Sequence, residues 1–205
     1  LFDIVPFAGF TGGVTVAAGE VSGDGVADII VGAGPGGGPA VKVFNGATGA
    51  VISSFFAYDT AFLGGVNVAA GDVNGDGLAD IITGAGPGSG PHVQVFDGRT
   101  TGLLFSFFAY NPTFTGGVTV AAGDMNRDGR ADIITGTGTG GGPNVKVFSG
   151  VNTQLLNSFF AFSPTFTGGV RVAAGDVNGD GYADLIVGQG STTGPLVTSL
   201  DGRTL

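Results

Sequence analysis

Short apolar and β-branched runs alternate along the chain with turns that are rich in glycine, proline, asparagine and aspartate. One unit contains, in order, an apolar run (65–70), an acidic turn (72–80), a second run (81–83), a glycine and proline loop (84–91), a third run (92–96), a turn (97–100) and an aromatic run (103–110). Runs of this length between turn-forming residues are typical of β-strands. No stretch combines helical spacing of apolar residues with a helix cap. The pattern therefore predicts an all-β chain with almost no helix.

The unit repeats with a period of 52 residues. The triplet Gly-Gly-Val begins at four evenly spaced positions, Gly12, Gly64, Gly116 and Gly168. A fixed long period is the mark of a repeat architecture. We therefore expect a single domain over 1–205, with repeats at about 10–61, 62–113 and 114–165 and a last repeat made of 166–205 plus 1–9.

Four short antiparallel strands per repeat match a β-propeller blade better than a sandwich, because sandwiches do not repeat at sequence level. Strands such as 29–31 and 185–187 are apolar at every position. Such strands are expected where each blade packs between two neighbours. The small residues of 17–19 recur in the first strand of each repeat, so we place that strand at the crowded central axis.

The two ends of the chain complement each other. The chain stops in the turn 201–205, just before a fourth strand, and it starts with 1–8, which has the pattern of a fourth strand. We therefore expect a β-propeller of four blades, each with four antiparallel strands, in a ring closed by the N-terminal strand. A closed ring predicts a monomer, whereas the alternative is a larger propeller from which this piece is cut.

Composition excludes several classes of partner. The 205 residues include no cysteine, one histidine and only seven lysines and arginines, and the net charge is −9. An acidic chain of this kind is not expected to bind nucleic acid or anionic membranes. No run of 18 apolar residues is present for membrane insertion, and the start lacks the features of a signal peptide. Seventeen phenylalanines argue against disorder.

The acidic turn carries the strongest chemical signal. Twelve of the sixteen acidic residues lie in four turns of nine residues. The candidate ligands at positions 1, 3, 5, 7 and 9 are Glu20, Ser22, Asp24, Val26 and Asp28 in the first turn; Asp72, Asn74, Asp76, Leu78 and Asp80 in the second; Asp124, Asn126, Asp128, Arg130 and Asp132 in the third; and Asp176, Asn178, Asp180, Tyr182 and Asp184 in the fourth. Position 7 would contribute its backbone carbonyl. Clustered carboxylates repel one another unless a cation lies among them.

Oxygen ligands at these positions, with glycine at position 6, suit Ca²⁺, which accepts six to eight oxygens. We therefore predict up to four Ca²⁺ ions per chain, with a weaker site in the first turn because of Glu20 and Ser22. Zinc would require cysteine or histidine. An EF-hand would require a glutamate at position 12, where Thr83 or its equivalents stand. An Asx-turn without metal is the structural alternative.

These turns and the strands that follow them resemble the FG-GAP or VCBS-like repeats, the group that includes the integrin α-subunit propeller. The resemblance rests on 72–80 followed by 81–87, and on 20–28 followed by 32–35. It implies an extracellular or cell-surface, secreted, calcium-stabilised propeller that recognises a protein or glycan ligand in adhesion. The fourth repeat departs from the pattern, with 189–191 in place of the Gly-Pro turn.

No catalytic set is evident, so we expect a protein that is not an enzyme. A lone histidine, His92, is expected to be an exposed residue at a strand edge, and the carboxylates outside the turns form no acid and base pair. Most rings of the aromatic runs are expected in the core, with Tyr58, Tyr110 and Phe162 as the exposed ones. The alternatives are a lectin, an accessory domain of a larger carbohydrate-active or hydrolytic enzyme, and a structural spacer.

Overall fold

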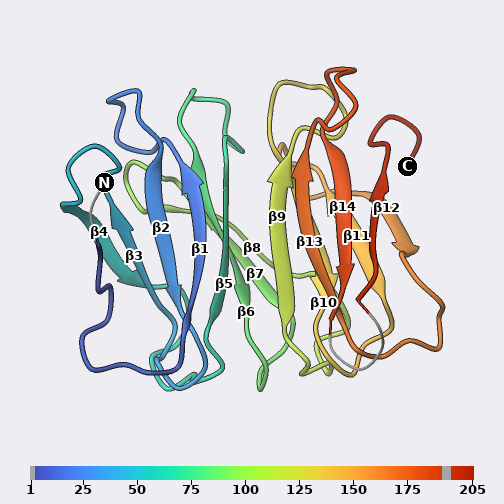
Figure 1. Ribbon diagram of the computed structural model, residues 1–205, viewed down its shortest axis with the longest axis horizontal. Coiled ribbons are helices and arrows are strands. Elements are labelled where there is room, and N and C mark those ends of the chain that lie inside the picture. The colour runs from blue at the N-terminus through green and yellow to red at the C-terminus, as the bar shows by residue number, and fades with distance from the viewer. Residues whose placement is uncertain (1–2, 191–194) are drawn as a thin grey trace.

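The structure is a four-blade β-propeller arrangement. The computed structural model describes residues 3–190 and 195–205, and every helix or strand assigned within them is a β-strand. The strands form four antiparallel sheets, each from consecutive strands (Figure 1). The predicted all-β propeller of four blades is confirmed. The described part of the chain contains no helix that is long and apolar enough to cross a membrane.

The blades are numbered in chain order. Blade 1 contains β1 (Val14–Gly19), β2 (Asp28–Ala33), β3 (Ala40–Phe44) and β4 (Val51–Phe56). Blade 2 contains β5 (Val66–Gly71), β6 (Asp80–Ala85), β7 (His92–Phe96) and β8 (Leu103–Phe108). Blade 3 contains β9 (Val118–Gly123), β10 (Asp132–Thr137), β11 (Asn144–Phe148) and β12 (Leu155–Phe160). Blade 4 contains β13 (Val170–Gly175), β14 (Asp184–Gln189) and β15 (Val197–Leu200).

The second strand of each blade lies inside a sheet that is covered on both faces. In β6 the neighbouring residues Ile81 and Ile82 are both fully buried. Successive side chains of a strand point to opposite faces. Ile81 packs in a cluster with blade 1, and Ile82 packs in a cluster with blade 3. The uniformly apolar strands are therefore explained by packing between two neighbours, as predicted.

The first strands of the blades form the inner row of the molecule. In Figure 1, β1, β5, β9 and β13 stand next to one another in front, and each packs on the next. Their small residues are required by close approach. A Cβ atom added at Gly71 would lie 2.8 Å from Cβ of Ala122 and 2.7 Å from Cβ of Ala131 in blade 3. The prediction that 17–19 and its equivalents lie at a crowded axis is confirmed.

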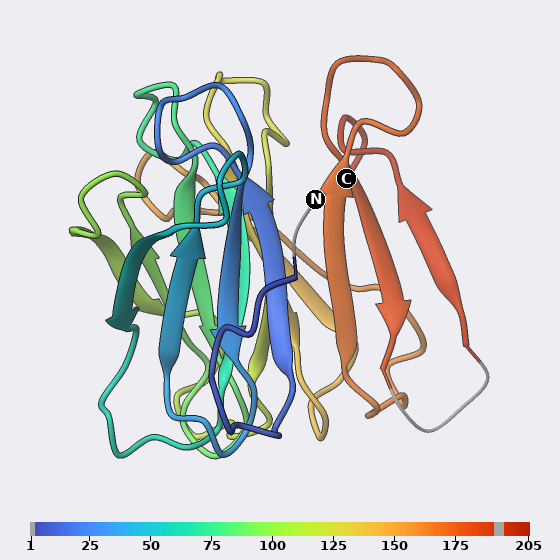
Figure 2. The same cartoon turned by 60° about the vertical axis from the view of Figure 1, so that its left-hand side comes forward.

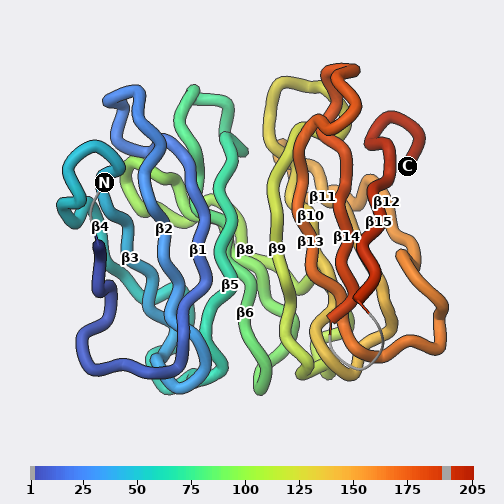
Figure 3. The backbone as a smooth tube through the Cα atoms, in the orientation of Figure 1, coloured from blue at the N-terminus to red at the C-terminus, as the bar shows by residue number. Residues whose placement is uncertain are grey.

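The row of blades is open, and the predicted closure by the N-terminal strand is wrong for the described residues. Blade 4 has three strands, and 3–13 contains none. Blades 1 and 4 lie at opposite ends of the longest axis in Figure 1, and the turned view of Figure 2 shows blade 4 without an outer strand. The segment before β1 runs beside blade 1 (Figure 3), where Nζ of Lys42 lies 5.4 Å from the centre of the Phe7 ring. Packing on blade 1 keeps this segment away from β15.

Coverage by the next blade predicts the effect of core substitutions. Ile82→Ala should lower the free energy of unfolding by roughly 2–5 kcal/mol, because the cavity is closed in on both sides. Ile186 holds the same repeat position in blade 4 but is only half-buried, since no further blade covers it. Ile186→Ala should therefore cost clearly less. Urea unfolding in dilute solution measures both values, and equal losses would contradict this account of the packing.

Candidate functional site

The four acidic turns lie together at one end of the molecule. Each turn joins the first strand of a blade to the second, at the top of Figure 1. The turn between the third and fourth strands lies beside it. Nδ2 of Asn45 donates to Oδ2 of Asp24 at 2.7 Å, and Nδ2 of Asn74 donates to Oδ2 of Asp97 at 3.4 Å. The acidic turns therefore lie at the same end of the molecule as the turns at Asn45 and Asp97.

The carboxylate at position 1 holds the turn in shape by accepting backbone N–H groups. Asp72 accepts from Gly75 N at 2.6 Å and from Gly77 N at 2.8 Å. Both glycines have φ near +80°, a conformation that other residues rarely adopt. Equivalent bonds from Gly23 and other amides hold the pKa of Glu20 below its usual value, and those from Gly181 and Gly179 do the same for Asp176. The backbone thus orients the first residue of each turn, and it favours the ionised form of Glu20 and Asp176.

The carboxylate at position 9 is buried and ties two turns together. Oδ2 of Asp80 accepts from the backbone N–H groups of Val73 and Asn74, both at 2.9 Å. Its Oδ1 accepts from Gly98 N at 3.2 Å and from Nδ2 of Asn74 at 3.1 Å. The equivalent carboxylates Asp28, Asp132 and Asp184 are likewise buried and accept from the same two turns. This residue type was predicted as a ligand, and the structure gives it a hydrogen-bonding role that the sequence did not reveal.

Burial opposes the ionisation of two of these carboxylates, Asp80 and Asp132. Burial is the largest cause that raises the pKa of Asp80, and it raises the pKa of Asp132 to about 6. The charges of Asp128 and Asp124 add to the shift at Asp132. A cation close to these side chains would have the opposite effect, since a positive neighbour favours the ionised form.

Three carboxylates converge on one amide nitrogen in the second turn. Nδ2 of Asn74 lies 3.1 Å from Oδ1 of Asp80, 3.4 Å from Oδ2 of Asp97 and 3.5 Å from Oδ2 of Asp76. In the third turn Nδ2 of Asn126 donates to Asp128 at 2.9 Å. An amide donor therefore lies where the negative charges meet. Asp97 was not among the predicted ligands, although its Asp-Gly turn lies at the same end of an antiparallel blade, which is a signal that could have found it.

The remaining predicted positions are placed as follows. Position 5, occupied by Asp24, Asp76, Asp128 and Asp180, accepts the backbone N–H of position 7 in each turn, from Val26, Leu78, Arg130 and Tyr182, at 2.8–2.9 Å. At position 3, the Asn178 amide donates to Asp184 at 3.4 Å, and the Ser22 hydroxyl donates to Glu20 at 3.2 Å. In the described ranges, no three histidine or acidic side chains are grouped closely enough as they stand to hold a metal ion.

The basic residues of the third turn reach toward the turns of neighbouring blades. Nη1 of Arg130 lies 3.5 Å from the carbonyl of Val73 in the second turn. The guanidinium carbon of Arg127 lies 5.4 Å from the centre of the Tyr182 ring in the fourth turn. Arg127 also has a φ of +61° at the position where the other three turns have glycine. The third turn therefore links its neighbours but carries backbone strain that the others avoid.

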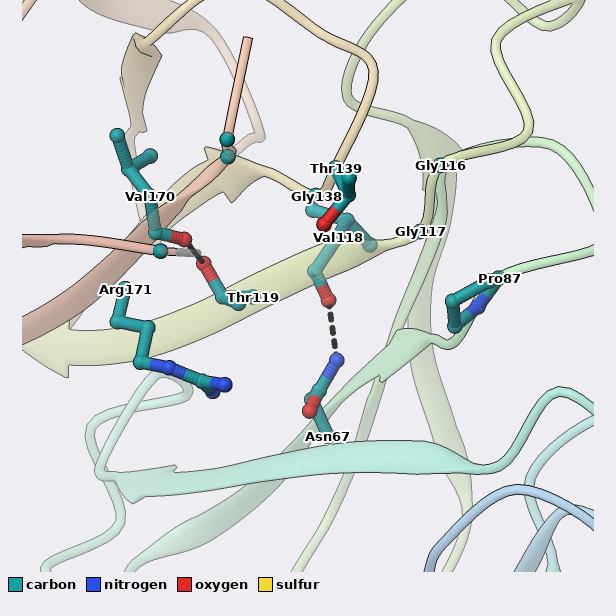
Figure 4. Close-up of a pocket in the computed structure, with 13 residues that line it drawn as sticks. Asn67, Pro87, Gly116, Gly117, Val118, Thr119, Gly138, Thr139, Val170 and Arg171 are labelled. Atoms are coloured by element: carbon teal, nitrogen blue, oxygen red, sulfur yellow. Dashed lines mark hydrogen bonds between the residues drawn. The ribbon is translucent and has the colours of Figure 1, made fainter. Parts of the chain in front are cut away.

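The opposite end of the molecule is formed by the glycine loops and the connections between blades. In blades 1 to 3 each glycine loop is bonded to the connection that leads to the next blade, by Gly36 N to Leu63 O at 2.8 Å and by the equivalent bonds of Gly88 and Gly140 at 2.9 Å. A pocket of about 220 Å³ lies among these loops, and Figure 4 shows Asn67 and Arg171 extending into it from inner strands. Asn67 donates to the carbonyl of Val118 at 2.8 Å.

The exposed aromatic rings differ from those predicted. The Tyr58 hydroxyl bonds to Thr83 and to the carbonyl of His92, and Tyr110 makes equivalent bonds to blade 3. Burial raises the pKa of both tyrosines, and Phe162 packs in the core of blades 3 and 4. The exposed rings are the second phenylalanines of the runs, Phe56, Phe108 and Phe160. The sequence of the run does not indicate which of its rings face solvent, and the prediction that Tyr58, Tyr110 and Phe162 are exposed is wrong.

The single histidine is packed rather than exposed. Its ring lies 4.9 Å from that of Phe108 and 5.4 Å from that of Tyr58, measured between ring centres. Nε2 and Oγ of Ser106 are 2.9 Å apart, and burial lowers the pKa of His92. No acidic residue is among these contacts.

Sequence and structure comparisons identify similar proteins. An FG-GAP-like repeat profile matches residues 72–135, and an FG-GAP repeat profile matches 168–195. The chain is 29% identical to integrin alpha-8 of Gallus gallus and 30% identical to integrin alpha-5 of Xenopus laevis. Each match covers 86% of this chain but only 20% and 19% of the integrin chains, so the chain spans about a fifth of their length. The exotype rhamnogalacturonan lyase YesX has a similar fold, with a TM-score of 0.59 and 17% identity over 97% of this chain and 43% of the lyase.

The buried carboxylate at position 9 predicts a large effect of its removal. Asp80→Ala should lower the free energy of unfolding by roughly 3 kcal/mol or more, because two buried backbone N–H groups and one part-buried N–H group lose their acceptor. The loss should be present in calcium and in EDTA alike. Asp59→Ala is the matched control, since Asp59 is exposed and accepts from Ala61 N at 2.8 Å. Chemical denaturation in both buffers measures these values, and a small loss in EDTA for Asp80→Ala would contradict the assigned role.

Proposed function

This chain belongs to the FG-GAP repeat family, and on that premise we propose that it is a calcium-binding, extracellular β-propeller module that recognises a protein or glycan ligand. Its acidic turns hold Ca²⁺ and stabilise the fold, and its opposite end binds the ligand. The module has no catalytic activity of its own. An extracellular or cell-surface location follows from the family resemblance.

The observation that carries the proposal is the convergence of Asp76, Asp80 and Asp97 on Nδ2 of Asn74. Three carboxylates around one point repel one another, and a neutral amide relieves the repulsion only in part. A divalent cation in place of the amide donor would neutralise them. The available donors are all oxygens, which suits Ca²⁺ better than zinc. With a net charge of −9, four divalent ions would leave −9 + 8 = −1.

The residues that fit the ion are the ones predicted, with one addition. In the second turn these are Asp72, Asn74, Asp76, the carbonyl of Leu78 and Asp80, together with Asp97 from the adjacent turn. The ion would supply a positive charge between the two turns, which Asp80 already connects by hydrogen bonds. In the first turn Asn45 stands in place of Asp97, and Glu20 and Ser22 replace aspartate and asparagine, so this site is weaker.

The ligand face is placed at the glycine-loop end. Glycine loops let a ligand approach the backbone closely, and the neighbouring residues Asp59, Asn111 and Ser163 differ among the repeats. The pocket that Arg171 and Asn67 line opens among these loops. A protein ligand is favoured by the relationship to integrin alpha chains.

A lectin or an accessory domain of a carbohydrate-active enzyme is the second candidate. The exposed rings Phe56, Phe108 and Phe160 occur once in each of blades 1 to 3, and aromatic faces stack on sugars. A Cβ atom added at Gly90 would lie 2.9 Å from the ring of Phe108, so this ring is beside the glycine loop of its blade. The similarity in fold to a rhamnogalacturonan lyase favours a glycan as ligand, although less than a quarter of the aligned residues are identical.

Calcium should raise the melting temperature of the wild-type protein, because an ion that binds only the folded state stabilises it by mass action. Asp76→Ala should lower the melting temperature in calcium and change it little in EDTA, since Asp76 is exposed and its one backbone donor is Leu78 N. Isothermal titration should find up to four Ca²⁺ per chain, with Kd values of roughly 10⁻⁴ to 10⁻³ M.

The control for this experiment is Asp59→Ala, which lies outside the turns and should leave the titration unchanged. Asp97→Asn should weaken binding at the second turn alone. Identical melting curves in calcium and EDTA, or binding of zinc in preference to calcium, would refute the metal assignment.

Glycan and protein arrays, probed with and without EDTA, test the ligand face. Asn111→Ala and Phe108→Ala should weaken ligand binding without changing the calcium content. Leu103→Ala is the matched control, because Leu103 is an exposed apolar residue at the other end of the same strand. Loss of binding only on substitution of Asn45 or Asp97 would place the ligand at the metal end instead.

A further inference from the structure

The two ends of the row of blades carry faces that no blade covers among the described residues, and these faces correspond by repeat position to the two sides of the interface between blades. Within the molecule this interface occurs between each pair of neighbouring blades. At the junction of blades 1 and 2, Ile30, Val41 and Val43 of blade 1 form one apolar cluster with Val66 and Val68 of blade 2. Every internal junction therefore joins the trailing face of one blade to the leading face of the next.

The leading face of blade 1 is exposed. Val16 is 66% exposed, whereas Val68, its equivalent in blade 2, is 8% exposed. Val14 is likewise exposed, while Val66 is buried. These valines differ in burial only because no blade precedes blade 1 in the described structure.

The trailing face of blade 4 is exposed in the same way. Val197 is 66% exposed, whereas its equivalent Val145 in blade 3 is fully buried. Val177 is also exposed, although Val73 at the same turn position is fully buried. Terminal repeats of soluble repeat proteins ordinarily present a polar outer face. Both ends of this row are apolar instead.

At the blade 4 end of the row, a hydrogen-bond donor that has an acceptor at every internal junction has none in the described part of the chain. The residue after the first valine of each inner strand donates to a carbonyl of the next blade: Thr15 to Val66 O at 2.6 Å, Asn67 to Val118 O at 2.8 Å and Thr119 to Val170 O at 2.9 Å. Arg171 holds this position in blade 4 and has no partner among the described residues. Figure 4 shows its side chain in the pocket that Asn67 also lines.

A second set of bonds joins the acidic turns. Ala79 N donates to the carbonyl of Glu20 at 2.7 Å, and Ala131 N donates to the carbonyl of Asp72 at 2.7 Å. The corresponding donor in blade 1 is Ala27 N, which has no partner in 3–190 or 195–205. In the first set the donor without a partner is Arg171 of blade 4, and the matching carbonyl is that of Val14 in blade 1. In the second set the donor is Ala27 N of blade 1, and the matching carbonyl is that of Asp176 in blade 4.

We infer that the trailing face of blade 4 docks on the leading face of blade 1 of a second copy of this chain, head to tail, and that two such contacts close a ring of two chains. A second copy supplies both missing halves at once. It brings apolar residues to Val16 and Val197 and gives Arg171 and Ala27 the carbonyls of Val14 and Asp176. Head-to-tail contacts of this kind form rings when the rotation closes.

The N-terminal segment completes the same arrangement. The outer edge of β15 has no neighbouring strand in the described residues. Lys42 faces the Phe7 ring as Lys146 faces the Tyr110 ring, at 5.4 Å and 5.0 Å. Tyr110 follows the outer strand of the preceding blade, so Phe7 already lies where the end of such a strand lies. In the dimer this segment is next to the partner's three-stranded blade 4 and supplies its fourth strand.

Light scattering and native mass spectrometry of the 205-residue chain test the inference. We expect the mass to reach twice the 20.0 kDa chain mass by a chain concentration of roughly 100 µM, in calcium and in EDTA. Val16→Asp and Val197→Lys should each weaken dimerisation roughly tenfold or more, because a charge would be buried without a partner. Both side chains are exposed in the single chain, so each variant should fold. Val151→Asp is the control, since Val151 is exposed on a turn of blade 3 away from both end faces.

Mixing the two variants tests the head-to-tail geometry. Val16→Asp retains an intact blade 4 face, and Val197→Lys retains an intact blade 1 face. A mixed dimer, identified by its mass, should therefore form at concentrations at which each variant alone is mostly monomeric. A wild-type chain that stays monomeric at every concentration would overturn the inference. It would indicate that the two faces pack against blades outside this sequence. Variants that dimerise as well as the wild type would overturn it too.

Discussion

The fold depends on the coverage of each blade by its neighbours. A single sheet cannot cover its own two apolar faces. Ile81 and Ile82 are both fully buried because a neighbouring blade packs on each face of the sheet. The inner strands add a steric condition, because Gly71 leaves room for Ala122 and Ala131 of the next blade. Stability is therefore a property of the junctions more than of single blades, and the two uncovered faces are the places where this requirement is unmet.

The acidic turns take part in the same junctions. Val73, inside the second turn, is fully buried in the core between blades 2 and 3, and Ala131 N of the third turn bonds to the carbonyl of Asp72. Asp80 then joins its turn to the one at Gly98, where a side chain would collide with the carbonyl of Ala79. A cation bound by these turns would therefore stabilise contacts between blades as well as the turn that holds it.

The sequence predicted the repeat, the strands and the four blades because turn-forming residues and apolar runs recur at a fixed spacing. It did not predict the open row, since closure depends on the rotation between blades, which no residue pattern records. The position of the acidic turns was predictable, but the role of Asp80 was not. A carboxylate reads the same in a sequence whether it binds a metal or accepts buried N–H groups, and Asp97 joins the second turn only through the antiparallel order of the strands.

Separation of the two ends limits how calcium can act on a ligand. The acidic turns and the glycine loops lie at opposite ends of strands of five or six residues, which is about 17–20 Å. At this distance a direct contact between ion and ligand is excluded, and salt screens the field between exposed charges. A bound calcium ion would therefore affect the ligand end only through the junctions. The inner strands connect the two ends at each junction, with the bond from Ala79 to Glu20 near the acidic turns and that from Thr15 to Val66 near the glycine loops. An ion that tightens the first bond holds neighbouring blades at one spacing, and so it also fixes the spacing of the loops that a ligand would bridge.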